Sequence, residues 1–198
     1  MPKHFPTKKI VAGIDEAGRG CLAGPVVSAA VILPKNFNNP ILNDSKTLSE
    51  SKRKFLAKII KKEAIFWSIG ISNVKEIDDI NILNASFLSM HRAINKLTKK
   101  PDILLIDGNR FKKYPKIDHL CIIKGDAKFM SIAAASIIAK TSRDKIMKEL
   151  DAIHPNYHWK KNKGYPTKKH RSSILEYGIN QHHRKSFKLL PNQLTLSL

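Results

Sequence analysis

One stretch near the N-terminus, residues 10–20, constrains the fold and the chemistry of this chain most strongly. It begins with β-favouring apolar residues, continues with the adjacent carboxylates Asp15 and Glu16, and ends in Gly18-Arg19-Gly20. Side chains of a continuous strand alternate between its faces, so we expect the strand to end near Asp15, with a bend that brings both acids towards one point. Taken alone, the stretch fits an ordinary polar strand end and glycine turn equally well.

Hydrophobic periodicity predicts an α/β protein. The predicted strands are residues 10–15, 25–33, 64–72, 102–107 and 120–123, and the predicted helices are residues 49–63, 74–97, 128–152 and 167–177. The first three strands lie close together in the chain, whereas strands and helices alternate in the second half. We therefore expect a mixed five-stranded sheet, antiparallel at the start and parallel after, with helices covering its faces.

The character of the chain changes after His154 and Pro155, where Lys, His and Gly become frequent. We expect residues 1–153 to form one domain, and residues 154–198 to form a basic, helical extension that packs on it. Neither part contains an internal repeat.

The chain of 198 residues has 36 Lys and Arg against 16 Asp and Glu, a net charge of +20. This charge predicts a polyanionic partner, and nucleic acid is favoured over a membrane surface because no basic segment has a wide apolar face. A compositional bias towards Lys, Ile and Asn is the alternative explanation.

Two cysteines, no bilayer-length apolar run and no signal segment predict a reduced, cytoplasmic protein. We expect a monomer with no obligate protein partner.

Three acidic positions follow one rule, because each lies at or just past the end of a predicted strand: Asp15 with Glu16, Asp107 and Asp126. Open sheets bind ligands beyond the carboxyl ends of their strands, so these four acids are expected to form one cluster. Asp107 in an ordinary turn and Asp126 as a helix N-cap are the alternatives. A continuous helix would place Asp144 about 27 Å from Asp126, so both residues cannot bind the same pair of metal ions. We therefore expect Asp144 to have a structural role.

Four ionised carboxylates repel one another unless cations neutralise them. A site made of oxygen ligands alone selects hard ions, Mg²⁺ or Mn²⁺, and two such ions can promote phosphodiester hydrolysis. A basic exterior around an acidic metal site is the electrostatic pattern of a nuclease. The alternatives are a non-catalytic nucleic-acid-binding module and a hydrolase, such as a glycosidase, that uses two carboxylates as acid and base.

An ordered series of motifs along nearly the whole chain resembles the type 2 ribonucleases H, the RNase HII family. The motifs are Asp15-Glu-Ala-Gly-Arg-Gly20, Leu22-Ala-Gly-Pro-Val26, Asp44-Ser-Lys46, Asp107-Gly-Asn109, Lys124-Gly-Asp-Ala-Lys128, Ser131-Ile-Ala-Ala-Ala-Ser-Ile137, Ala139-Lys140, Ser142-Arg-Asp144 and Lys163-Gly-Tyr-Pro-Thr167. A lone Gly-Arg-Gly would carry little weight, but the ordered series is specific.

The resemblance implies an RNase H-like fold with a helical C-terminal part, in which residues 1–153 are the catalytic domain. It implies cleavage of the RNA strand of RNA–DNA hybrids and of single ribonucleotides embedded in duplex DNA, leaving a 3′-hydroxyl and a 5′-phosphate. The catalytic and metal-binding residues would be Asp15, Glu16, Asp107 and Asp126.

The resemblance also implies how the substrate is bound. Gly18, Arg19 and Gly20 would contact the ribonucleotide and its 2′-hydroxyl, and Tyr165 would pack on the sugar at the RNA–DNA junction. These roles agree with the residue types, because RNA is told from DNA by its 2′-hydroxyl and glycine permits close backbone approach.

Three of these positions carry alternatives or a departure from the family pattern. Tyr165 packed under a loop is the alternative for that residue. Lys46 is a candidate for a phosphate contact, with a solvated surface lysine as the alternative. Cys21 departs from the family, whose members often have proline or another residue there, and we expect it to place an exposed thiol beside the substrate.

Overall fold

The computed structural model describes residues 2–42 and 48–190. A single five-stranded sheet, with strand order β3-β2-β1-β4-β5, forms its centre. The strands are β1 (Val11–Ala17), β2 (Val26–Ile32), β3 (Phe66–Ser72), β4 (Ile103–Asp107) and β5 (Asp118–Ile122). The helices are α1 (Glu50–Glu63), α2 (Val74–Asn95), α3 (Met130–Ile153), α4 (Trp159–Asn162) and α5 (Lys168–Tyr177), with 3₁₀ turns at Gly125–Ala127 and Pro155–Tyr157.

The sheet is mixed, as the order of the predicted elements indicated. β2 pairs antiparallel with both β1 and β3, whereas β4 pairs parallel with both β1 and β5. The prediction of an antiparallel first half and a parallel second half is therefore confirmed. Because β1, β4 and β5 run in one direction, their carboxyl ends meet at the same edge of the sheet, which is where the acidic residues lie.

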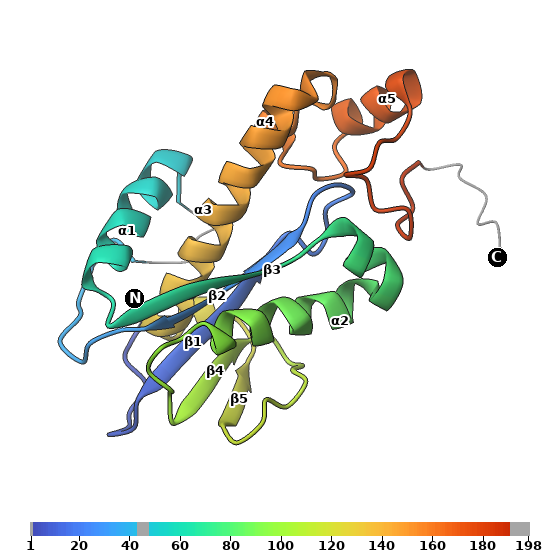
Figure 1. Ribbon diagram of the computed structural model, residues 1–198. Helices are drawn as coiled ribbons and strands as arrows, with labels where there is room; N and C mark the ends of the chain where they lie inside the picture. The colour runs from blue at the N-terminus through green and yellow to red at the C-terminus, as the bar shows by residue number, and fades with distance from the viewer. Residues whose placement is uncertain (1, 43–47, 191–198) are drawn as a thin grey trace.

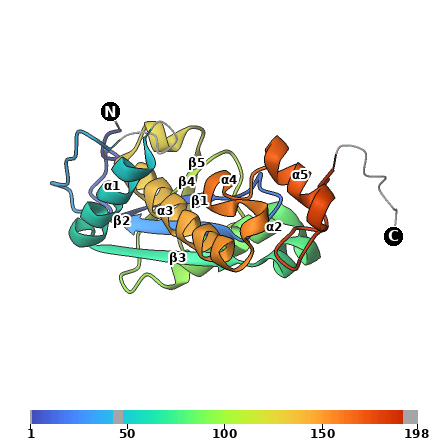
Figure 2. The ribbon, with the colours of Figure 1, turned by 90° about the horizontal axis from the view of Figure 1, so that it is seen from above.

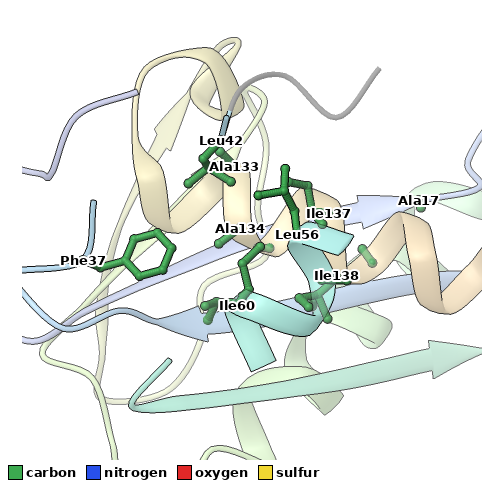
Figure 3. Close-up of a cluster of buried hydrophobic side chains, with 14 residues drawn as sticks. Ala17, Phe37, Leu42, Leu56, Ile60, Ala133, Ala134, Ile137 and Ile138 are labelled. Atoms are coloured by element: carbon green, nitrogen blue, oxygen red, sulfur yellow. The ribbon is translucent and has the colours of Figure 1, made fainter. Parts of the chain in front are cut away.

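Helices cover both faces of the sheet (Figures 1 and 2). On one face α1 packs on α3, and α3 packs on β1 and β2; Figure 3 shows Leu56 and Ile60 of α1 meeting Ala134, Ile137 and Ile138 of α3. On the other face Met90, Ala93 and Ile94 of α2 pack on apolar residues of β1, β2 and β4. The apolar, small-residue middle of α3 thus lies flat on the sheet, as its sequence indicated.

Several element boundaries differ from the prediction. β1 does not end at Asp15 but continues to Ala17, so the expected bend at the two acids was wrong. β5 begins earlier than predicted, at Asp118. α2 is interrupted at Asn81, whose φ of 64° is not helical and whose side chain accepts a hydrogen bond from Asn84 N, as an N-cap does. The short helix α4 was not predicted.

The chain beyond α3 packs beside the turn that joins β1 to β2 (Figure 1). Tyr157 and Trp159 form an apolar cluster with Ala23, and Ile174 and Leu189 form a second one with Leu22. Residues 22–23, which belong to the β1–β2 connection, are therefore covered by the C-terminal part of the chain. No helix in the described part of the chain has the length and apolar character needed to cross a bilayer.

Candidate active site

Asp15 and Asp107 lie at the carboxyl edge of the sheet on neighbouring parallel strands. The register pairs Ile14 with Ile106, so Asp15 and Asp107 follow at the same level. Asp15 is buried, with 6% of its surface exposed, and its carboxylate accepts hydrogen bonds from the Ser136 side chain of α3 and from Glu16 N, the latter at 2.6 Å. β1 therefore holds Asp15 against α3.

Glu16 lies on the opposite face of β1, because the strand continues through both acids. It lines a small cavity together with Ser86 and Met90 of α2 and with Asp107. Its Oε1 pairs with Arg19 Nη1 at 3.2 Å. The two neighbouring acids thus approach Asp107 from the two faces of the sheet, rather than from one side of a bend.

Asp126 lies in the 3₁₀ turn Gly125–Ala127, between β5 and α3, and is 3% exposed. The residue before it, Gly125, donates its N–H to Asp107 Oδ1 at 2.7 Å, which joins this turn to the end of β4. The N-cap of α3 is Phe129, so the alternative assignment of Asp126 as that N-cap was wrong. Its Oδ1 instead accepts from Ala127 N at 3.0 Å.

The electrostatics of the site are dominated by burial and by repulsion among Asp15, Glu16 and Asp107. Burial raises the pKa of Asp15 well above its usual range, and repulsion by Glu16 and Asp107 raises it further. Burial also raises the pKa of Glu16, although Arg19 opposes this effect. Glu16 and Asp107 repel each other as well. The protein itself supplies less positive charge here than the acids require, which favours binding of a cation.

The donor set fits a hard divalent ion in an open site. Glu16 Oε2 is buried and accepts no hydrogen bond from any described residue, so it is available as a ligand. No group of three or more His, Cys, Asp or Glu side chains within residues 2–42 and 48–190 forms a ready-made cage. Mg²⁺ is commonly held by one or two carboxylates, with waters and substrate phosphate completing its coordination, so an open arrangement of acids suits it.

The turn after β1 adopts a conformation that requires glycine. Gly18 has a φ of +101°, and a Cβ atom built there would lie 2.0 Å from Arg143 Nε. Gly18 is buried, whereas Arg19 and Gly20 are exposed at the surface beside the acids. The conformation therefore presents residues 19–20 to solvent while the chain before them stays packed.

Two buried arginines hold this turn, and both were missed as site residues in the sequence. Arg143 of α3 donates to the carbonyl oxygens of Pro25, Ala23 and Lys163 at 2.9, 3.0 and 2.8 Å. Arg184 donates to the carbonyl oxygens of Gly18, Arg19 and Gly24. Arg143 belongs to one of the motifs of the family resemblance, which could have indicated it. Arg184 lies in a basic stretch that resembled a solvent-facing tail, and nothing in the sequence distinguishes it from the exposed basic residues around it.

Tyr165 lies beside the same turn. The carbonyl of Gly164 accepts from Leu22 N at 2.8 Å, and Cys21 Sγ contacts the carbonyl of Lys163 at 3.6 Å. Tyr165 is 39% exposed, Lys140 Nζ lies 5.9 Å from its ring centroid, and its hydroxyl interacts with the Cys21 thiol. Cys21 itself is fully buried, so the expected exposed thiol was wrong: the C-terminal segment covers it.

Asp144 was expected to have a structural role. Asp144 is 4% exposed and pairs with Lys140 Nζ at 2.5 Å, one turn earlier on α3, which confirms a structural ion pair. Lys46, the candidate phosphate contact, lies outside the described residues.

The sheet order and the acidic edge define an RNase H-like protein, and the comparisons agree. A family model, Ribonuclease HII, matches residues 12–190. Ribonuclease HII of Christiangramia forsetii is 60% identical over 99% of both chains. The crystal structure of ribonuclease H2 from Pyrococcus horikoshii has a TM-score of 0.75 at 26% identity, covering 90% of this chain and 94% of the other.

A second solved structure, RNase HII from Archaeoglobus fulgidus in complex with PCNA, has a TM-score of 0.74 at 26% identity and covers 94% of this chain and 98% of its own. The chain belongs to the ribonuclease HII family. It is an enzyme, an endonuclease of the ribonuclease H type, so the non-catalytic binding module is not retained.

Proposed function

We propose that this enzyme cleaves the RNA strand of RNA–DNA hybrids and also single ribonucleotides embedded in duplex DNA, leaving a 3′-hydroxyl and a 5′-phosphate. The observation that carries the proposal is the position of the Gly-Arg-Gly turn, whose exposed residues Arg19 and Gly20 follow directly after the strand that bears Asp15 and Glu16. The residues that would contact the 2′-hydroxyl of the ribonucleotide thus lie within a few positions of the acids that would act on its phosphate.

We assign the catalytic and metal-binding role to Asp15, Glu16, Asp107 and Asp126. Two divalent ions, Mg²⁺ or Mn²⁺, would supply an activated water and stabilise the leaving oxygen when bound. The protein's part is to keep the carboxylates in place: Ser136 orients Asp15, and Gly125 orients Asp107. Glu16 keeps one oxygen free for a ligand.

Recognition of RNA in this proposal depends on the 2′-hydroxyl, which DNA lacks. Residues Gly18, Arg19 and Gly20 would contact the ribonucleotide, and the half-exposed ring of Tyr165 would pack on the sugar at the junction. Lys46 stays a candidate for a phosphate contact. We further propose that residues 1–153 are the catalytic domain and that the basic residues of 154–198 bind the duplex backbone.

The test is cleavage of a DNA duplex that contains one ribonucleotide, beside a matched RNA–DNA hybrid and an all-DNA duplex. We expect a cut on the 5′ side of the ribonucleotide with Mg²⁺ or Mn²⁺, none with a chelator, and none in the all-DNA duplex. Absence of a metal-dependent cut in the first substrate would contradict the proposal. The ratio of rates with the two ions would identify the preferred metal. Cytoplasmic location and the monomeric state stay predictions.

A further inference from the structure

Arg184 is a fully buried cation whose guanidinium contacts backbone oxygens. It donates to the Gly18 carbonyl at 2.7 Å, to the Arg19 carbonyl at 2.9 Å and to the Gly24 carbonyl at 2.8 and 3.0 Å. The ring of Phe187 covers it, 5.1 Å from the guanidinium carbon. One side chain near the C-terminus therefore holds both ends of the turn that follows β1.

This arrangement costs more free energy than simple packing requires. Within the described part of the chain no carboxylate forms an ion pair with Arg184, and burial lowers the pKa of its guanidinium to about 10. A buried charge is expensive unless polar groups solvate it, and here the carbonyl oxygens of Gly18, Arg19 and Gly24 do so. The guanidinium therefore requires these carbonyls to point towards it.

That geometry determines which way the turn presents its backbone. In a planar trans peptide the carbonyl and the N–H of the next residue point in opposite directions. Because the carbonyls of Gly18 and Arg19 point inwards to Arg184, the N–H groups of Arg19 and Gly20 point outwards. Neither N–H donates to any described residue, and both residues are exposed. Two consecutive donors therefore face solvent beside the acidic cluster.

The segment that carries Arg184 is itself anchored on three sides. Arg184 N donates to Leu22 O, and Gly24 N donates to His182 O, each at 2.8 Å. Asp78, in the first part of α2, accepts from Lys185 N, Ser186 N and Ser186 Oγ at 3.1, 3.0 and 2.6 Å. The guanidinium is therefore delivered to the turn by a fixed backbone rather than by a loose tail.

We propose that Arg184 is a positioning residue for recognition of the ribonucleotide: it fixes the Gly18–Gly20 turn so that its outward N–H groups can donate to oxygen atoms of the substrate sugar and phosphate. The inference rests on the proposed function, because it assumes that this turn meets the ribonucleotide. Arg184 itself would not touch the substrate.

The test compares Arg184→Met with the wild-type full-length chain and with Lys99→Met, a control that removes one exposed positive charge at the opposite end of the sheet. Two quantities are measured: kcat and KM on duplex DNA with one embedded ribonucleotide, and the Kd for an all-DNA duplex of the same sequence. We expect Arg184→Met to lower kcat/KM about tenfold or more, the size of one or two lost hydrogen bonds. Its Kd for the all-DNA duplex should stay within about twofold, because the exposed phosphate-binding charges are unchanged.

The outcomes separate this inference from the proposed function. Failure of the wild type to cleave would contradict the proposed function, whereas a wild type that cleaves and an Arg184→Met protein with unchanged kcat/KM would overturn the role of Arg184. A parallel loss of kcat/KM and of all-DNA binding would indicate a merely structural role and would also overturn it. If Arg184→Met does not fold, Arg184→Lys replaces it in the test. A lysine ammonium cannot donate to three carbonyls at once, so we expect kcat/KM to fall about threefold. A wild-type kcat/KM in Arg184→Lys would overturn the inference.

Discussion

At the scale of single residues, Asp15 and Glu16 show how two neighbours in a chain can serve one site from two directions. Asp15 is held by Ser136 on the face covered by α3, and Glu16 lies on the face covered by α2. Asp107 repels both, so it lies close to each. The alternation of a strand therefore places the two neighbouring acids on opposite faces of the sheet edge.

Asp15→Asn should abolish turnover while leaving duplex binding largely intact. The substitution keeps the shape of the side chain but removes the negative charge that a metal-dependent site needs, so we expect kcat to fall by at least about a hundredfold. Single-turnover cleavage and a binding titration measure the two effects separately. Asp118→Asn, at the start of β5 and the other end of the strands, is the matched control and should be as active as the wild type. Equal activity in the Asp15→Asn protein would remove Asp15 from the site.

Gly18→Ala and Gly20→Ala should differ sharply in stability. At Gly18 the left-handed backbone and the clash with the Arg143 side chain both oppose a Cβ atom, whereas nothing lies within 4 Å of a Cβ built at Gly20. We expect Gly18→Ala to lower the free energy of unfolding by about 1 to 3 kcal/mol and Gly20→Ala to leave it nearly unchanged. Denaturant unfolding measures both, and equal values for the two variants would contradict this account of the turn.

At the scale of elements, the site depends on how closely α3 approaches β1. A Cβ atom built at Gly13 would lie 2.1 Å from the backbone carbon of Ser131, so only glycine permits this contact. The small residues Ala133, Ala134 and Ala135 continue the close packing along α3. This contact brings Ser136 within hydrogen-bonding distance of Asp15. The helix thus positions a candidate catalytic carboxylate without contributing an acid of its own.

The elements after α3 should make the fold sensitive to mild acid. His183 is buried, with its Nε2 3.3 Å from that of His170, and burial together with the neighbouring histidine lowers its pKa to about 4. The pKa values of His170 and His182 are also lowered, chiefly by burial. Below pH 6.5 these histidines bind protons in the unfolded chain before they do so in the native protein, so their contribution to the free energy of unfolding falls as the pH falls towards 4. The raised pKa values of Asp15 and Glu16 act in the opposite direction.

We expect a loss of roughly 2 kcal/mol between pH 6.5 and 5, since one pKa unit corresponds to about 1.4 kcal/mol. Denaturant unfolding across this range measures it. His183→Gln should flatten the pH dependence, whereas His119→Gln on the edge strand β5, outside the histidine cluster, should not. A pH dependence that is the same in the His183→Gln protein and in the wild type would contradict the prediction.

At the scale of the whole molecule, a net charge of +20 surrounds a site made of acids. In the proposed function the positive exterior would attract the nucleic acid, and the acidic edge would repel its phosphate unless divalent ions were bound. Substrate affinity and catalysis should thus respond to different conditions: affinity to ionic strength and catalysis to the divalent ion. The C-terminal part should affect both affinity and catalysis. Its basic residues add to the positive charge, and it also buries Arg184 against the turn after β1.

Duplex affinity should fall steeply with salt. If six or more phosphates are neutralised, the Kd should rise by about a thousandfold or more between 50 and 200 mM monovalent salt. The slope should be the same for an all-DNA duplex and for one with a single ribonucleotide, because the number of phosphate contacts does not change. Binding measured in both duplexes across the salt range tests this, and a flat salt dependence would show that the positive charge has no part in binding.

The strands, the long helix α3 and the mixed sheet could be predicted from the sequence, because apolar periodicity reports which residues are buried. The acids were found for a related reason, because each follows an apolar run and the carboxyl ends of neighbouring parallel strands meet at one edge of the sheet. Periodicity does not say where a strand stops when polar residues lie within it, which is why the end of β1 was placed at Asp15 instead of Ala17.

The inward position of Arg184 and the burial of Cys21 could not be predicted from the chain alone. An arginine in a basic stretch looks the same whether it faces water or a set of carbonyl oxygens, since its partners lie some 160 positions away. Likewise the thiol is buried by residues that come together only when the C-terminal part packs on the β1–β2 connection. The local sequence determines whether a segment forms a helix or a strand, whereas long-range packing determines which side chains that segment contacts.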